Sequence, residues 1–317
     1  MLNKTLQDAL FPVTEEEQRI LGGQGFDRNL YMNQDDIIRA DKMLEAGSLI
    51  AFRAHPRFAP FPLHRHDYVE MVYMCSGQTT HIINGKRLTL KEGELLLLAQ
   101  HTTQEILAAS EKDIAVNFII LPAFFEQVLP MVGEKDAPLR RFLVDCLYGQ
   151  QNDIPYLHFK VTDVTAVQNL MENLMLSFLT PTPSRRQIRQ STMGLLFLHL
   201  LGQTEHLLPA DPAQALLLTV YRYIEEHYAD GTLTELSEKL HFAPAFLSRR
   251  IRELSGRTYT ELVQEKRLSR AAFLLRHTTR NVDDIARAVG YDNVSYFHRL
   301  FQRQFGCSPR RHRLKVK

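Results

Sequence analysis

The sequence predicts a multidomain α+β protein, with a small β-barrel and following helices in its N-terminal part and an all-α double helix-turn-helix at its C-terminal end. Three observations predict this fold. Short apolar runs separated by turn residues fill residues 48–121, apolar residues at helical spacing follow from residue 162, and one helix-turn-helix pattern occurs twice after residue 230. The 317 residues suffice for two or three domains with their own cores.

Composition favours an ordinary folded protein. Hydrophobic residues make up 44% and charged residues 23% of the chain, which argues against disordered, collagen-like and rod-like proteins. The apolar stretches, such as residues 95–99, are shorter than the roughly 20 residues that a bilayer requires. The N-terminus lacks the basic start and apolar run of a secretory signal. These features predict a cytoplasmic protein without membrane attachment.

The three cysteines are Cys75, Cys146 and Cys307, an odd number with no metal-ligand spacing, which argues against a disulfide scaffold or a zinc module. Charge is unevenly distributed. Residues 216–317 contain 19 lysines and arginines against 11 aspartates and glutamates, a net charge of +8, whereas the preceding residues carry −6. A basic domain attracts nucleic acid or an anionic membrane surface. A merely solvated basic face is the alternative that composition leaves open.

The β-rich region is predicted to form a domain over residues 48–160. Asn84-Gly85 between two apolar runs predicts a two-residue hairpin turn, because both positions tolerate a positive φ. Residues 1–47 are expected to form an arm that closes the barrel or touches the other domain.

Two amphipathic helices are predicted within residues 161–206. Apolar residues from Val164 to Leu179 follow helical spacing, residues 181–184 interrupt them, and a second helix is expected over residues 184–202. Their apolar faces suit pairing across a homodimer; packing on the barrel alone is the alternative. The two prolines within residues 207–214 predict a linker.

The first helix-turn-helix pattern lies over residues 231–256. Thr232 and Glu235 form a capping box, and Pro244 suits the first position of the second helix. The residues of that second helix expected to point inward are Phe246, Leu247 and Ile251, and those expected to point outward are Ser248, Arg249 and Arg252.

The second pattern lies over residues 281–306. Gly290 is expected to end its first helix in a left-handed conformation, and Asp292 or Asn293 to cap the next helix. The side chains expected in the core are Phe297, Leu300 and Phe301, which leaves Ser295, His298, Arg299, Gln302 and Arg303 for the other face. A long helix over residues 259–275 separates the two patterns.

A helix-turn-helix places its second helix in the major groove, where arginine reads guanine bidentately. Two units in one chain need adjacent groove segments, about 34 Å apart. Helix-turn-helix patterns also occur in helical proteins that never touch DNA. Two copies with exposed arginines and a net charge of +8 favour double-stranded DNA as the partner.

Residues 233–313 resemble the DNA-binding domain of the AraC/XylS family of bacterial transcription regulators. The segment IARAVGYDNVSYFHRLFQRQFGCSPRRHR, residues 285–313, matches the family pattern almost throughout. Four positions depart from it: Ser237, Ala243, Ile251 and His312 stand where the family has Ala, Ser, Phe and Tyr. The missing cap at Ala243 is expected to cost about 1 kcal/mol of helix stability.

The resemblance implies a DNA-binding domain over residues 215–317, and it implies base-facing positions on both second helices. These positions are Ala245, Ser248, Arg249, Val294, Ser295, His298 and Arg299. Basic residues near helix ends more often contact phosphate than bases. The arginines assigned to phosphate, or to no contact, are Arg250, Arg252, Arg303, Arg310 and Arg311.

Residues 64–70, HRHDYVE, and residues 91–106 resemble the two cupin motifs found in the sensor domains of the same family. Strand alternation places the candidate ligand-binding residues His64, His66, Tyr68 and Glu70 on one face, inside a cupin-like barrel. The resemblance places Gln104, the fifth candidate, where metal-binding cupins have a further histidine. An organic effector is therefore preferred, ahead of histidines that only satisfy one another and of a catalytic metal. No cofactor is expected.

The sequence thus predicts a sequence-specific transcription regulator rather than an enzyme. The resemblance implies an activator that senses a small molecule, for which carbohydrates are the family expectation, and that works with RNA polymerase. Arg53 and Arg57 either pair with an acidic ligand or are exposed. Two alternatives remain: a metal-dependent cupin enzyme fused to a DNA-binding domain, and a DNA-binding regulator without a ligand. No nucleophile-base pair, phosphate loop or paired carboxylates support an enzyme.

Overall fold

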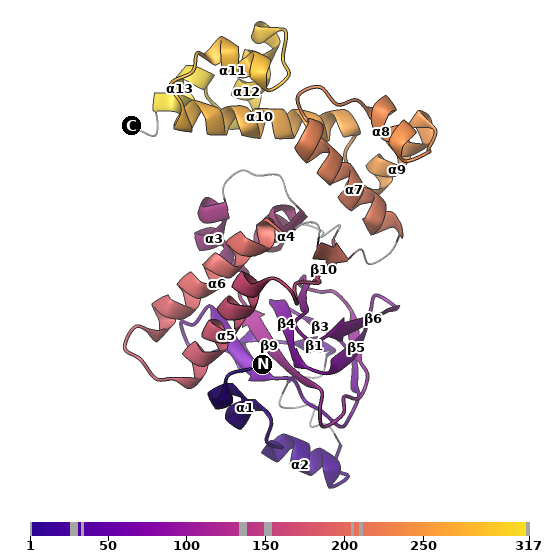
Figure 1. Cartoon of the computed structure of the whole chain (residues 1–317), viewed down its shortest axis with the longest axis vertical. Helices are drawn as coiled ribbons and strands as arrows, with labels where there is room; N and C mark the ends of the chain where they lie inside the picture. Colours follow the sequence, from indigo (N-terminus) through magenta and orange to yellow (C-terminus); the bar gives the residue numbers. More distant parts are fainter. Residues whose placement is uncertain are drawn as a thin grey trace. The chain divides into compact units, whose positions relative to one another are not determined.

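A computed structural model describes residues 2–25, 31–32, 35–132, 138–148, 154–203, 206–208 and 212–314. The chain divides into two compact units, one formed by residues 1–132 with 142–210 and the other by residues 133–141 with 211–317. Figure 1 shows that the strands belong to the first unit, which also contains helices, and that the described elements of the second unit are helices. No described helix is both long and apolar enough to cross a membrane.

The strands of the first unit form two sheets (Figure 1). The first sheet has the order β1-β3-β8-β5-β6, with strands Ile37–Ile38, Phe61–His66, Gln104–Ile106, Gln78–Ile83 and Lys86–Lys91. The second has the order β11-β10-β7-β4-β9-β2, with strands Leu207–Leu208, Tyr156–Phe159, Leu95–Leu98, Val69–Ser76, Ile114–Ile120 and Ile50–Ala54. The predicted hairpin turn is confirmed, since Asn84 and Gly85 have φ of 48° and 76°.

The second sheet is covered on both faces, which explains why β4 and β7 are apolar without alternation. Val72 and Met74 belong to a buried cluster with Leu96 and Leu98. On the opposite face, the Tyr73 hydroxyl donates to Gln168 Oε1 at 2.6 Å, and Phe52 stacks on Phe178 with ring centroids 5.4 Å apart. Gln168 and Phe178 belong to α5, so this helix packs against the sheet.

The helices of the first unit include the two predicted ones, α5 (Thr165–Leu179) and α6 (Arg185–Leu201), which contact each other. The others are α1 (Lys4–Leu10), α2 (Glu15–Leu21), α3 (Phe125–Val132), most of α4 (Pro138–Tyr148) and the 3-10 turns η2 (Ala40–Lys42) and η3 (Pro122–Phe124). Neither α3 nor α4 was predicted. The linker expected over residues 207–214 is shorter, because Leu207–Leu208 pairs with β10 and α7 begins at Pro212; residues 209–211 lie outside the described residues.

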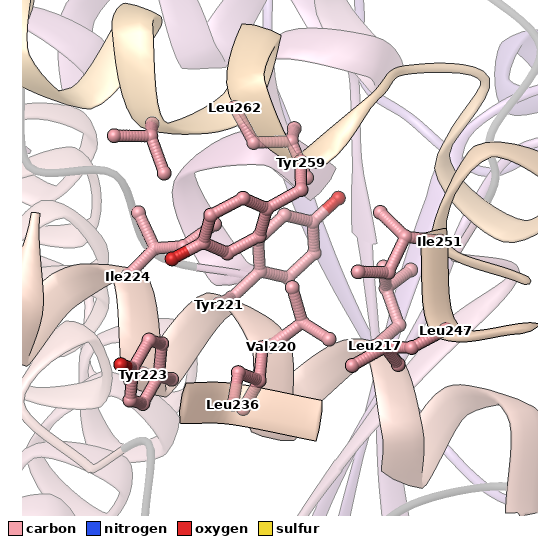
Figure 2. Close-up of a cluster of buried hydrophobic side chains, with 11 residues drawn as sticks. Leu217, Val220, Tyr221, Tyr223, Ile224, Leu236, Leu247, Ile251, Tyr259 and Leu262 are labelled. Atoms are coloured by element: carbon pink, nitrogen blue, oxygen red, sulfur yellow. The ribbon is translucent and has the colours of Figure 1, made fainter. Parts of the chain in front are cut away.

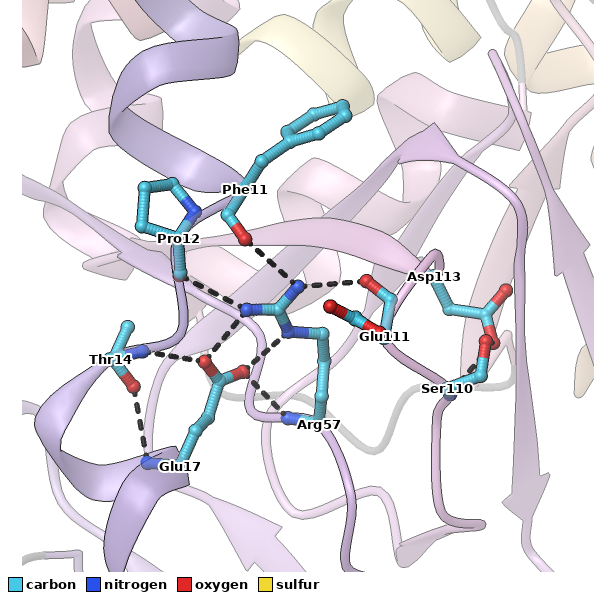
Figure 3. Close-up of polar contacts among 8 residues, drawn as sticks. All are labelled: Phe11, Pro12, Thr14, Glu17, Arg57, Ser110, Glu111 and Asp113. Atoms are coloured by element: carbon cyan, nitrogen blue, oxygen red, sulfur yellow. Dashed lines mark hydrogen bonds and ion pairs between the residues drawn. The ribbon is translucent and has the colours of Figure 1, made fainter. Parts of the chain in front are cut away.

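The N-terminal residues pack on the sheets. Arg57 is buried rather than exposed, and its guanidinium donates to both carboxylate oxygens of Glu17 on α2, at 2.7 and 2.8 Å (Figure 3). It also donates to the carbonyl oxygens of Phe11, Pro12 and Glu111. The alternative that Arg57 pairs with an acidic ligand is therefore wrong, because all its donors are used within the protein. The predicted arm also contributes β1, which pairs with β3 in the first sheet.

Two small cores build the second unit. The first gathers buried side chains from α7 (Pro212–His227), α8 (Leu233–Lys239), α9 (Pro244–Ser255) and α10 (Tyr259–His277), as Figure 2 shows. The second gathers side chains from α10, α11 (Val282–Ala288) and α12 (Val294–Phe305). α13 (Pro309–Leu314) packs against α10 and α12. The long helix α10 is thus shared by both helix-turn-helix units.

The local signals at the helix ends are confirmed. Thr232 and Glu235 form the capping box, and Asn293 rather than Asp292 caps α12 by accepting from the Tyr296 N–H at 2.9 Å. Ala243 caps α9 without a side-chain hydrogen bond, as its apolar side chain requires. Gly290 has a φ of 94°. One orientation was wrong: Phe246 is exposed, because Leu247 and Ile251, four residues apart, share the core face of α9, and Phe246, next to Leu247 in sequence, points to a different side of the helix.

Candidate ligand pocket and candidate nucleic-acid interface

A small pocket lies between the two sheets of the first unit. Its cavity volume is about 30 Å³, which is room for about two water molecules. The lining residues come from both sheets and from the N-terminal segment. They are Tyr31, Ile38, Met43, Arg53, His55, Pro56, Phe61, His64, His66, Tyr68, Glu70, Ile106, Asn117 and Ile119. A larger molecule therefore fits only after lining side chains move.

The one carboxylate in the pocket lining is held by two side-chain amides. Glu70 Oε2 accepts from Gln104 Nε2 at 3.1 Å, and Glu70 Oε1 accepts from Asn117 Nδ2 at 2.9 Å. Burial raises the pKa of Glu70. His66 Nε2 lies 3.8 Å from Glu70 Oε1, which is too long for a direct hydrogen bond. Glu70 is thus fixed at the pocket wall by neutral donors.

Two buried histidines have their tautomers set by their neighbours. His64 Nδ1 lies 2.7 Å from the Pro62 carbonyl oxygen and must donate, so His64 Nε2 accepts from Gln104 Nε2 at 3.3 Å. His81 Nδ1 then donates to Gln104 Oε1 at 3.3 Å, and His81 Nε2 accepts from Thr79 Oγ1 at 3.0 Å. Each ring has one donor and one acceptor, as a neutral imidazole requires.

Burial keeps these imidazoles neutral. Burial lowers the pKa of His64 to about 4, with His66 nearby as the second cause, and lowers the pKa of His66 to about 3. Burial and then His55 lower the pKa of His81 to about 3. At neutral pH the pocket therefore offers uncharged donors and acceptors around one buried carboxyl group, which suits a ligand with hydroxyl groups better than an anion.

The structure brings the five predicted ligand-binding residues together. His64, His66, Tyr68 and Glu70 line the cavity, whereas Gln104 lies behind them and contacts His64 and Glu70. A bulge in β3 between Phe61 and His64 sets the register that pairs His64 with Gln104. Three aromatic residues, Tyr31, Phe61 and Tyr68, line the cavity, while Phe52 and Tyr73 contact α5 on the other face of the second sheet.

Among the lining residues that were not predicted from the sequence, His55 and Asn117 are a hydrogen-bonded polar pair. His55 Nδ1 lies 3.2 Å from Asn117 Oδ1, and burial lowers the pKa of His55. An asparagine inside the apolar run IAVNFII was the available signal, since a polar residue in a buried strand needs partners. Among the described residues, no three His, Cys, Asp or Glu side chains are placed to hold a metal ion.

Arg53 also lies at this pocket, but it is bound to the N-terminal segment. Its guanidinium pairs with Glu16 at 2.8 Å, donates to the Tyr31 hydroxyl and lies 4.2 Å over the centre of the Tyr31 ring. The Tyr31 hydroxyl donates to Glu16 Oε1 at 2.6 Å. Arg53 is therefore engaged within the protein, and the pocket keeps no unpaired cation at this wall.

In the second unit, the predicted DNA-binding residues lie on α9 and α12, which are the second helices of the two helix-turn-helix units. On α9, Ala245, Arg249 and Arg252 are exposed and Ser248 is half-buried. On α12, Ser295, Arg299 and Arg303 are exposed, whereas Val294 and His298 are half-buried. Arg249 and Arg299 are each the sixth residue of their helix. The acidic neighbour of Arg249 is Glu253, whose Oε1 lies 3.7 Å from Arg249 Nε. Glu253 also pairs with Arg250, whose Nη1 lies 3.0 Å from Glu253 Oε2.

Two family models match the chain. The model described as an AraC-like ligand binding domain matches residues 46–174, and one described as a helix-turn-helix domain matches residues 236–315. The HTH-type transcriptional activator RhaS of Citrobacter koseri is 26% identical over 258 residues, which cover 79% of this chain and 86% of that protein. RhaS of Salmonella schwarzengrund is 26% identical over 261 residues, 80% of this chain and 87% of that protein.

Solved structures also match. The C-terminal domain of AraT, a response regulator from Geobacillus stearothermophilus, is 32% identical, covers 33% of this chain and 88% of that one, and has a TM-score of 0.31. ToxT from Vibrio cholerae is 14% identical, with 84% of this chain and 97% of that chain covered and a TM-score of 0.31.

Proposed function

Because the chain belongs to the AraC family of transcription regulators, we propose that it binds promoter DNA through α9 and α12 and a small-molecule effector in the pocket between its sheets. The observation that carries the DNA-binding part is the recurrence of an exposed arginine at the sixth position of both helices, in a segment with a net charge of +8. We place the sensor at residues 48–160, the connecting helices at 161–206 and the DNA-binding domain at 215–317.

The relatives named as transcriptional activators support activation, and with it a contact to RNA polymerase in the cytoplasm. An apolar strip on α6 supports a homodimer: Ile188 and Leu195 are seven residues apart, share one helix face and are exposed. These two side chains lie outside the face of α6 that packs within the unit. We propose regulation of transcription, without catalysis, as the whole function of the chain.

If Arg299 reads a base, its removal should weaken binding to the specific DNA site selectively. Arg299→Ala is expected to lose about 1–3 kcal/mol of binding free energy on a specific site, because a bidentate guanine contact disappears, while the affinity for random-sequence DNA hardly changes. The specific site is obtained by selecting duplexes from a random library with the wild-type protein, and both affinities are then measured by titration. Arg287→Ala, which removes an exposed arginine from α11, is the charge-matched control. Equal losses on both DNAs would show that Arg299 contacts phosphate.

The effector pocket predicts ligand-dependent stabilisation of the full chain. We expect one compound from a panel of sugars, sugar alcohols and sugar acids to raise the Tm saturably, because a ligand that binds only the folded state stabilises it by mass action. His66→Asn should abolish this shift, since His66 lines the cavity. His101→Asn is the matched control, because His101 is exposed and asparagine tolerates its φ of 61°.

The panel also includes Zn²⁺, Mn²⁺ and Fe²⁺. Stabilisation by a metal alone would favour the cupin enzyme instead, and no stabilisation by any compound would favour a regulator without a ligand. Saturable stabilisation that His66→Asn leaves unchanged would place the ligand outside this pocket.

A further inference from the structure

The same three-membered contact occurs at the beginning of α9 and of α12. In the first, the ring centroids of Phe242 and Phe246 are 5.3 Å apart, and the Arg249 guanidinium lies 5.9 Å from the centre of the Phe246 ring. In the second, the rings of Tyr291 and Tyr296 are 6.3 Å apart, and the Arg299 guanidinium lies 5.3 Å from the centre of the Tyr296 ring. Each unit thus brings a turn aromatic, a helix aromatic and an arginine into contact, with the two rings tilted by 38° in the first unit and 59° in the second.

The helix aromatics occupy equivalent positions and do not belong to the cores. Phe246 and Tyr296 are each the third residue of their helix, three residues before the arginine. They are 41% and 43% exposed, whereas the next residues, Leu247 and Phe297, are fully buried and carry the packing. A single exposed aromatic needs no explanation. Two at the same helix position, each beside the arginine that faces outward, indicate a shared role.

We propose that Phe246 and Tyr296 are positioning residues that hold the guanidinium groups of Arg249 and Arg299 for base reading. This inference rests on the proposed function, in which these arginines contact bases. A guanidinium over the face of a ring is attracted by the charge distribution of the ring, and its N–H donors remain available for a bidentate contact with guanine. The ring therefore reduces the freedom that the arginine loses when it binds DNA.

The two sets of contacts differ in how firmly they are anchored. Tyr291 is buried and lies under the Arg267 guanidinium, 5.5 Å from it, so the second set is attached to the core. Phe242 is exposed, and Arg249 is also drawn toward Glu253 Oε1 at 3.7 Å. The second set of contacts therefore holds its arginine more firmly, and loss of the Tyr296 ring is expected to cost more specific binding than loss of the Phe246 ring.

The test compares variants of the full chain on a duplex selected from a random library by the wild-type protein and on random-sequence DNA. Tyr296→Leu is expected to weaken binding to the selected duplex about threefold to tenfold, with random-sequence binding and Tm unchanged. Tyr296→Phe keeps the ring and should restore binding to within about twofold of wild type. Phe246→Leu should show a smaller loss, and Phe246→Tyr should restore it.

A double mutant shows whether the ring acts through the arginine. Tyr296→Leu/Arg299→Ala should bind the selected duplex as Arg299→Ala does, because the ring has nothing left to position. Phe273→Leu is the matched control, since Phe273 is 41% exposed on α10 and also lies beside an arginine, Arg270 at 5.1 Å. It should leave both affinities unchanged.

Each of the following results would overturn the inference. The first is an additive double mutant, which would mean that the ring contacts DNA itself. The second is an equal loss on both DNAs or a loss with Phe273→Leu, which would mean a general effect of removing an aromatic ring. In the third, Tyr296→Leu binds the selected duplex as wild type does although Arg299→Ala loses specific binding. Arg299 would then read bases without being positioned by the Tyr296 ring. If Arg299→Ala itself keeps full specific affinity, base reading fails, and this inference fails with it.

Discussion

Arg57→Ala is expected to destabilise the N-terminal unit by about 3–5 kcal/mol, because it leaves the buried Glu17 carboxylate without its counter-charge. Figure 3 shows why the loss is large: the guanidinium joins Glu17 on α2 to the carbonyl oxygens of Phe11, Pro12 and Glu111. The removal of Arg57 therefore also leaves three carbonyl groups without this donor. Denaturant titration of the full chain, followed by circular dichroism, measures the effect.

Two further variants test whether the loss of stability comes from the buried Arg57–Glu17 pair. Arg57→Lys retains the positive charge but not the planar guanidinium, and its free energy of unfolding should lie between those of wild type and Arg57→Ala. Arg39→Ala removes an arginine paired with Asp35 at 2.6 Å on the surface, and its effect should be much smaller. If Arg57→Ala unfolds as Arg39→Ala does, the buried pair is not an anchor of the N-terminal residues.

The pair also sets an acid dependence. Burial, the largest single influence, would raise the pKa of Glu17, but the hydrogen bonds from Arg57 and from the Thr14 N–H together with the charge of Arg57 outweigh burial and lower this pKa. Because the folded-state pKa lies below the unfolded value of 4.5, this contribution to stability is present above pH 4.5 and is lost as the pH falls further. The difference in stability between wild type and Arg57→Ala should narrow over the same range.

Gly290→Ala is expected to destabilise the second unit by about 3–5 kcal/mol and to abolish specific DNA binding. A Cβ atom there would lie 2.3 Å from the Ala229 carbonyl oxygen and 2.8 Å from the Arg267 guanidinium carbon, and the φ of +94° is strained for alanine. Arg267 donates to the carbonyl oxygens of Tyr228, Ala229 and Gly290 at 2.6, 3.0 and 2.7 Å. The clash therefore falls on the contacts that join α12 to the rest of the unit through α10.

Gly306→Ala is the matched control for this substitution. Gly306 also has a positive φ, 68°, but nothing lies within 4 Å of the added Cβ. Only the backbone strain remains, about 1 kcal/mol, and specific DNA binding should persist. Thermal unfolding and duplex titration of the two variants separate the clash from the strain. Similar losses in both variants would show that the close approach at Gly290 is unimportant.

Features that depend on residues a few positions apart were predicted from the sequence. Asn84-Gly85 gave the hairpin turn, Thr232 and Glu235 the capping box, and Gly290 the left-handed helix end. The two helix-turn-helix units and the amphipathic helices after residue 162 followed from apolar spacing in the same way. The candidate pocket residues His64 to Glu70 could be grouped because strand alternation assigns side chains to one face.

Contacts between distant residues were decided only by the tertiary structure. Glu17 and Arg57 are 40 positions apart, and no local pattern distinguishes a buried arginine from an exposed one. His55 and Asn117 meet because β2 pairs with β9, and Gln104 reaches His64 through the bulge in β3. The sequence by itself thus determined the hairpin turn, the two helix-turn-helix units with their caps and the family resemblance, since these depend on interactions within one or two turns; it did not predict α3 and α4. The tertiary structure decided which polar groups meet, because strand register and layer packing bring together residues that no spacing rule connects.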